Sequence, residues 1–129
     1  LAMGLSDRSK KANTQTYQHL VAEVLGLDPA AVREPILEPS KNDSAEAAAF
    51  VRGLPGHGPL VGLNTGAGGR WAYKQWTRAH QQTFLRLATD AGLRVLLLGG
   101  PEEVATHKEL LAAAAGRPVF DGGNHNSYG

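Results

Sequence analysis

The sequence predicts an α/β fold in which helices flank a small parallel sheet. From residue 60 onward, short apolar runs alternate with helical patterns in the order strand, helix, strand, helix, strand. The run "RVLLLGG", Arg94 to Gly100, is apolar at successive positions, which is typical of parallel strands covered on both faces. Glycine marks the end of both intervening helical patterns. Together these observations predict a partial Rossmann-like domain, half of a doubly wound sheet.

A first helix is expected near the start of the chain, with Asn13 or Thr14 as its cap. Its apolar residues recur at helical spacing: Tyr17, Leu20, Val21, Val24 and Leu25. Gly26 is placed to end this helix in a left-handed conformation, and Pro29 blocks its continuation.

A connector and a second helix are expected next. The segment from Pro29 to Pro39 holds three prolines and predicts extended chain. Asp43 with Glu46 suits a capping box for an alanine-rich helix that ends near Arg52. The glycines and prolines of residues 53–59 then break the chain.

The following strand and helix have clear signals. "LVGLN", Leu60 to Asn64, is a short apolar run bounded by turn signals, so it predicts a buried strand. Thr77 can cap a helix that Gly92 ends. The predicted apolar face of this helix is Phe84, Leu87, Ala88 and Ala91, with Leu85 beside it.

A last helix and strand complete the pattern. Glu102 and Glu103 suit the positive N-terminus of a helix that Gly116 ends. The predicted buried face of this helix is Val104, Leu110, Leu111 and Ala114. The run "PVFD", residues 118–121, predicts a third short strand.

Composition argues against several classes of function. The net charge of +1 offers no basis for nucleic-acid binding, and the absence of cysteine excludes disulfides and thiolate metal sites. No apolar run approaches the roughly 20 residues of a membrane span, and no signal peptide is apparent. Cysteine usage leaves the compartment unconstrained, and a cytoplasmic location fits the sequence. No metal-ligand spacing is found, and neither a metal nor a cofactor is expected.

Three loops should meet at the carboxyl ends of the predicted strands, where ligands bind in open parallel sheets. They are residues 65–76, 99–103 and the segment from 121 onward. The first loop is rich in glycine, carries Arg70 and Lys74, and leads into a helix, features that suit a diphosphate. However, neither a dinucleotide fingerprint nor a P-loop fits, and an ordinary strand-to-helix turn would contain glycine too. Spacing alone therefore leaves a phosphate site and a plain turn open.

Side chains of the other loops also have two interpretations. Glu102 or Glu103 could accept hydrogen bonds from ribose hydroxyls, or could simply compensate a helix dipole. His107, inside a helix, is expected to be a solvated or packing residue. No Ser–His–Asp arrangement can be assigned from local signatures.

An ordered set of motifs resembles one family of enzymes. "LNTGAGG", "KQWT" and "LLLGGPEE" are similar to the loops of glycosyltransferase family 9, which contains the ADP-heptose:lipopolysaccharide heptosyltransferases. "ANTQTYQHLVAEVLGLD" resembles the end of that family's first domain, and "DGGNHNSYG" resembles the start of its next loop and helix. The resemblance therefore spans nearly the whole chain.

The resemblance implies a GT-B architecture, with two Rossmann-like domains facing across a cleft. Residues 1–55 would be the helical tail of the first domain and the connector, and residues 56–129 the first half of the donor-binding domain. The implied donor-binding residues are Thr65, Gly66, Ala67, Lys74, Gly99, Glu102 and Glu103. Among them, Lys74 would contact the donor diphosphate, and Glu102 or Glu103 the ribose. The catalytic base would lie outside this chain, which alone would be inactive.

The resemblance also implies partners. These are a nucleotide-sugar donor, ADP-heptose or similar, and a lipopolysaccharide or other bacterial surface saccharide as acceptor. Peripheral association of the complete protein with the inner face of the cytoplasmic membrane and self-association of the segment are further expectations. The family's prolines are replaced here by Thr65 and Thr77, and the loop before Lys74 is longer, so another donor is open.

Other interpretations compete with the glycosyltransferase. A sugar-nucleotide epimerase, or another nucleotide-binding α/β protein, could share the same plan. A Rossmann-like binding module without catalytic activity is the non-enzymatic alternative. The leucine at position 1 and the loop-like last residues lead us to expect a segment of a longer protein, with a small complete protein as the alternative.

Overall fold

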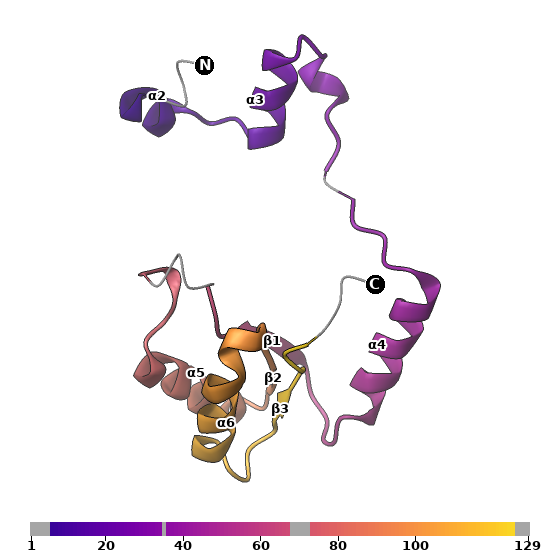
Figure 1. The fold of residues 1–129 in the computed structure, drawn as a ribbon, viewed down its shortest axis with the longest axis vertical. Coiled ribbons are helices and arrows are strands. Elements are labelled where there is room, and N and C mark those ends of the chain that lie inside the picture. The colour runs from indigo at the N-terminus through magenta and orange to yellow at the C-terminus, as the bar shows by residue number, and fades with distance from the viewer. Residues whose placement is uncertain (1–5, 35, 68–72, 126–129) are drawn as a thin grey trace. The chain divides into compact units, whose positions relative to one another are not determined.

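The computed structural model of the chain describes residues 6–34, 36–67 and 73–125 (Figure 1). The chain divides into two compact units, Leu1–Glu38 and Pro39–Gly129, and each is described by itself. The assignment of residues 1–55 and 56–129 to two domains of a larger protein stays a prediction. Arg70 and Trp71, which belong to the predicted glycine-rich loop, lie outside the described residues.

The first unit contains short helical elements, α2 (Asp7–Ala12), α3 (Tyr17–Val24) and the 3-10 turn η1 (Pro29–Ala31). The helix expected here is confirmed, but its cap is Thr16, whose side chain accepts a hydrogen bond from the His19 N–H at 3.4 Å. The expected cap Asn13 instead uses its Oδ1 to bind the Gln15 N–H at 3.0 Å. Among the described residues of this unit, Ala22 is the one that is buried, so the unit encloses little core.

Helix α4 (Lys41–Gly53) opens the second unit. Ser40 caps it, because the Ser40 Oγ accepts from the Asp43 N–H at 3.1 Å and donates to Asp43 Oδ2 at 2.5 Å. The predicted capping box of Asp43 and Glu46 is therefore wrong by three residues, since a serine hydroxyl upstream can serve the same exposed N–H groups. No residue of α4 is buried.

Three strands form the sheet: β1 (Leu60–Asn64), β2 (Arg94–Leu98) and β3 (Val119–Asp121). They lie in the order β1-β2-β3, and both pairings are parallel. The register sets Leu63 beside Leu97, and Leu97 beside Asp121, so the carboxyl ends of all three strands lie together. The predicted α/β class, a parallel sheet with flanking helices, is confirmed.

Two helices connect the strands, α5 (Arg78–Asp90) and α6 (Val104–Ala113), the latter preceded by the 3-10 turn η3 (Pro101–Glu103). Thr77 caps α5 as predicted, because its hydroxyl accepts from the His80 N–H at 3.3 Å. Gly92 and Gly116 follow the two helices with φ of 81° and 80°, the left-handed conformation predicted for them.

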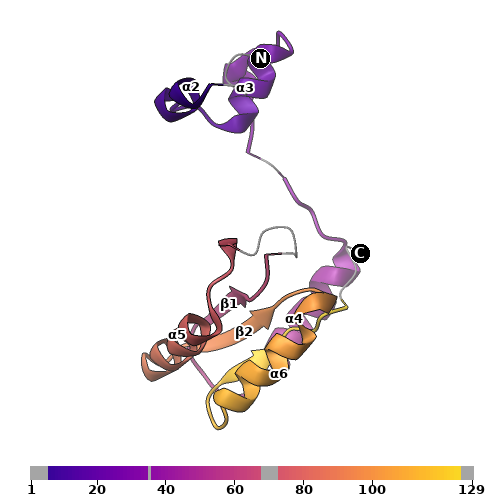
Figure 2. The same cartoon turned by 60° about the vertical axis from the view of Figure 1, so that its left-hand side comes forward.

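Helices α5 and α6 lie side by side on the sheet (Figures 1 and 2). Both crossovers step in the same direction along the sheet, and right-handed crossovers of this kind place their helices on the same face. The residues buried between the helices and the sheet are Leu63, Leu85, Ala88, Val95, Leu97, Leu110, Ala114 and Val119.

Two packing predictions are corrected by this arrangement. Leu87 and Ala91 of the predicted α5 face are exposed, whereas Leu85, placed beside that face, is buried in the core. Strand β2 was expected to be covered on both faces, but its burial alternates: Val95 and Leu97 are buried and Leu98 is 40% exposed. The reason is that both described crossover helices share one face.

None of the helices in the described parts of the chain is long and apolar enough to cross a membrane.

Candidate functional site

Thr65, the residue after β1, is the centre of a hydrogen-bond network at the carboxyl edge of the sheet. It is fully buried, at 0% exposure. Its N–H donates to the Leu98 carbonyl at 2.9 Å, which ties the end of β1 to the end of β2. Its carbonyl accepts from the side-chain amides of Gln75 at 2.6 Å and Gln81 at 3.0 Å. These bonds anchor the segment before α5, and α5 itself, to the end of β1.

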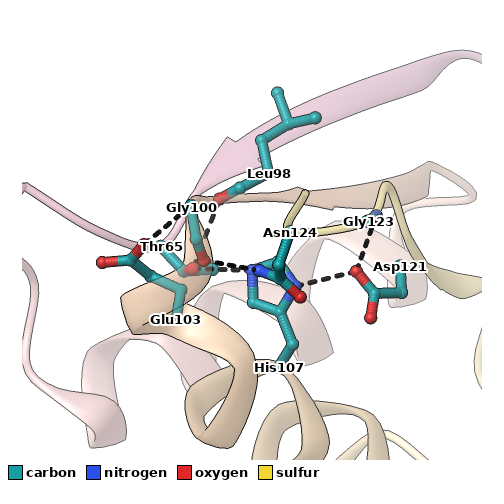
Figure 3. A network of polar contacts seen from close by, with 8 residues as sticks. All are labelled: Thr65, Leu98, Gly100, Glu103, His107, Asp121, Gly123 and Asn124. Carbon is teal, nitrogen blue, oxygen red and sulfur yellow. Dashed lines mark hydrogen bonds and ion pairs between the residues drawn. The ribbon is translucent and has the colours of Figure 1, made fainter. Parts of the chain in front are cut away.

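His107 joins this centre to β3. The ring is 1% exposed, and its Nε2 lies 2.9 Å from Thr65 Oγ1 (Figure 3). Its Nδ1 lies 2.8 Å from Asp121 Oδ1. A carboxylate only accepts hydrogen bonds, so Nδ1 carries a hydrogen and donates it to Asp121. The Thr65 hydroxyl has a single hydrogen and lies within hydrogen-bonding distance of both His107 Nε2, at 2.9 Å, and the Leu98 carbonyl, at 3.3 Å. The ring therefore bridges the ends of the first and third strands.

Asn124 closes the network from the loop after β3. Its Nδ2 lies 3.3 Å from His107 Nδ1 and donates to the Gly100 carbonyl at 3.0 Å (Figure 3). The loop after β2 is thereby bound to the loop after β3. In the part of the chain that the structure describes, no buried side-chain nitrogen or oxygen lacks a hydrogen-bond partner.

Glu103 explains two of the glycines at this edge. Its carboxylate is mostly buried and accepts from the Gly100 N–H at 2.7 Å. The same side chain packs against Gly66, where an added Cβ would overlap the carboxyl group. A Cβ on Gly99 would approach Glu103 Cβ to 2.8 Å and His107 Nε2 to 3.0 Å. Close packing is therefore sufficient reason for glycine at both positions.

The structure brings four of the predicted donor-binding residues together: Thr65, Gly66, Gly99 and Glu103. Ala67 follows them and is half-buried. Lys74 and Glu102 are exposed, the former beside the anchored Gln75 and the latter on η3. The N–H of Gly66, in the loop predicted to bind phosphate, instead donates a hydrogen bond to Asn64 Oδ1 at 3.1 Å. The donor-binding role of all these residues stays a prediction.

Sequence reasoning missed the polar residues that organise this edge, chiefly His107, Gln81 and Asp121. A signal for the first was present, because His107 lies three residues after Val104 and three before Leu110, within the stripe predicted to be buried. Gln81 likewise precedes the buried Leu85 by four residues on α5. Nothing local identified Asp121, because its partner His107 is 14 residues away.

Thr65, His107 and Asp121 have the connectivity of a nucleophile–histidine–aspartate triad, but not the access that one needs. A nucleophile must meet its substrate, and Thr65 has no exposed surface. The arrangement instead stabilises the edge, because buried polar groups that are fully hydrogen-bonded hold one conformation.

Exposed side chains lie beside this buried network. Tyr73 and Trp76 are exposed in the segment before α5, and the Trp76 ring packs edge-to-face on Phe84 with centroids 5.7 Å apart. The Asp121 side chain is 40% exposed although one of its oxygens binds the buried His107.

Two other features contribute no site at this edge. Within the described residues, no group of three or more His, Asp or Glu side chains could hold a metal ion. A groove between α5 and α6 lies along the helices; it is lined by Ala79, Gln82, Thr83, Leu85, Arg86, Ala113, Ala114 and Arg117. None of these residues belongs to the strand-end loops.

Comparison with known proteins leaves the family open. No protein-family model, curated protein or solved structure matches the chain. The resemblance to glycosyltransferase family 9 therefore stays a prediction.

Proposed function

We propose that the carboxyl edge of the sheet binds the diphosphate and ribose of a nucleotide-sugar donor. In this proposal the chain is the donor-binding half of an inverting glycosyltransferase that needs no metal. The observation that carries the proposal is the joining of three strand-end loops, 65–67, 99–103 and 121–125, by the Thr65–His107–Asp121 and Asn124–Gly100 bonds. Open parallel sheets bind nucleotides at such an edge.

Lys74 is the proposed contact to the diphosphate. Its neighbour Gln75 is anchored on the Thr65 carbonyl at 2.6 Å, which ties the exposed lysine's segment to the end of β1. The capped N-terminus of α5 begins four residues later and adds a positive dipole end. The ordered resemblance of "KQWT" and "LLLGGPEE" to the family-9 loops is the second support.

Calorimetric titration of the complete polypeptide containing this sequence tests the proposal. We expect binding of at least one among ADP, UDP, GDP and their sugars. Lys74→Ala removes a charge-assisted phosphate contact and should weaken that binding by roughly 1.5–3 kcal/mol.

Lys108→Ala is the matched control, because Lys108 is an exposed lysine on α6 and belongs to no strand-end loop. It should leave affinity unchanged. Equal affinities for wild type and Lys74→Ala would remove Lys74 from the site, and a complete lack of nucleotide binding would refute the proposed function.

The acceptor side of the reaction belongs to the complete protein in this proposal. A lipopolysaccharide or other surface saccharide would enter from the facing domain, where a carboxylate base would activate its hydroxyl. Peripheral binding to the cytoplasmic membrane would bring the enzyme to such an acceptor. A transfer assay with the complete polypeptide and a nucleotide sugar measures this activity directly.

A further inference from the structure

The three carboxylates of the carboxyl edge differ in what they bind. Glu103 is mostly buried, and its Oε2 is engaged by the Gly100 N–H. Glu102 is exposed on η3. Asp121 combines both properties: it is 40% exposed, yet one of its oxygens is held by the buried interior. It is therefore the carboxylate that is both oriented and accessible.

The orientation of Asp121 comes from two donors that share one oxygen. Oδ1 accepts from His107 Nδ1 at 2.8 Å and from the Gly123 N–H at 2.9 Å. Among the described residues, all the hydrogen bonds of the Asp121 side chain go to this oxygen. Figure 3 shows the second oxygen, Oδ2, turned away from the histidine ring. The donors thus fix the group without occupying Oδ2.

His107, which holds this carboxylate, is itself held by hydrogen bonds at both ring nitrogens. A buried imidazole is stabilised only if both ring nitrogens are hydrogen-bonded, and here Nε2 is satisfied by Thr65 while Nδ1 is satisfied by Asp121. The ring is itself held in an interior position of α6. An acceptor held in this way binds a ligand with little loss of conformational entropy.

We propose that Asp121 binds a hydroxyl group of the ligand through Oδ2, with His107 as its positioning residue. The inference rests on the proposed function, because it concerns the same edge and the same ligand. A carboxylate accepts hydrogen bonds and donates none, so its partner is a hydroxyl of the ribose or of the donor sugar. The carboxylate repels phosphate oxygens, whereas Lys74 attracts them. The proposal therefore places the phosphates toward the Lys74 segment and the hydroxyls toward β3.

The test compares ligands with and without the ribose hydroxyls, and with and without the donor sugar. The probes are whichever of ADP, UDP or GDP binds the complete polypeptide, the 2′,3′-dideoxy form of that nucleotide, and its nucleotide sugar. Wild type should prefer the ribose form by roughly tenfold or more, the effect of one hydrogen bond to a charged group. Asp121→Ala should reduce this preference to near one while the affinity for the dideoxy form stays unchanged.

A preference ratio measured within one variant does not depend on how much of that variant is folded, because both affinities refer to the same active fraction. Asp121→Ala could keep the ribose preference but no longer bind the nucleotide sugar more tightly than the nucleoside diphosphate. The hydroxyl that Asp121 binds would then belong to the sugar, and the proposal holds. If all ligands weaken equally, or none does, Asp121 only caps its loop and the proposal fails. No nucleotide binding in wild type would instead refute the proposed function itself.

Two further variants assign the roles. Glu102→Ala tests the competing assignment, because the resemblance implies that Glu102 or Glu103 contacts the ribose. Loss of the ribose preference in this variant rather than in Asp121→Ala would overturn the proposal. His107→Gln should lower the ribose preference, as Asp121→Ala does, because the Asp121 carboxylate loses the hydrogen bond from the ring. A His107→Gln protein that is less stable but keeps the full preference would show that the histidine has no positioning role.

Discussion

Thr65 shows how one buried residue can connect every element of the candidate site. Its N–H, carbonyl and hydroxyl are all hydrogen-bonded, to β2, to the segment before α5, to α5 and to α6. Burial of a polar side chain is tolerated only when such bonds form, so the residue is favourable here because its partners are in place. A proline at position 65, the residue that the resemblance to the family-9 loops would place there, has neither the N–H nor the hydroxyl that these bonds use.

A substitution at Thr65 measures what the buried hydroxyl contributes. Thr65→Val keeps the shape but removes the hydroxyl, which leaves the buried His107 Nε2 without its hydrogen-bond partner. We expect the free energy of unfolding to fall by about 1–3 kcal/mol in urea denaturation. Thr65→Ser retains the hydroxyl and should lose clearly less. Equal losses in the two variants would show that the methyl group, rather than the hydrogen bond, matters.

At the scale of elements, two helix caps of the same kind should differ in their effect on stability, because one helix packs in the core and the other does not. Thr77→Ala removes the cap of α5, whose Leu85 and Ala88 are in the core, so global stability should fall by about 1 kcal/mol. Ser40→Ala removes the same kind of cap from α4, which has no buried residue. Here we expect faster amide exchange within α4 and an unchanged unfolding midpoint. A large loss of global stability in Ser40→Ala would contradict the exposed character of α4.

Elements were predicted best where a local signal determines them. The strand "LVGLN" and the Thr77 cap follow from short patterns, and both are confirmed as β1 and the start of α5. The expectation that this strand is buried is wrong for most of β1, in which Leu63 alone is buried. The apolar face of α5 was misjudged because Leu85 and Leu87 are equally apolar, and only the position of the sheet decides which is buried. His107 was missed as a site residue since its partners Thr65 and Asp121 are distant in sequence.

At the scale of the molecule, local patterns predicted the parallel sheet but not which of its faces is covered. The run of leucines in β2 is apolar on both faces, and this pattern predicts two covering layers. Both described crossover helices lie on one face, so Leu96 is half-buried and Leu98 is 40% exposed on the other. The direction of each crossover depends on strand order, which no short stretch of sequence contains.

The division of the chain predicts that the second unit folds without the first. Among the described residues, the hydrophobic core cluster of this unit lies between Leu63 and Val119. A polypeptide of residues 39–129 should therefore unfold cooperatively, with a thermal midpoint within about 4 °C of that of the whole chain, the shift that 1 kcal/mol produces in a domain near this size.

A shorter form, residues 39–117, lacks β3 and with it Val119 and Asp121, so it loses core packing and the partner of His107. This control should not unfold cooperatively. If residues 39–129 behaved like the control, the second unit would not fold by itself and the prediction would be wrong.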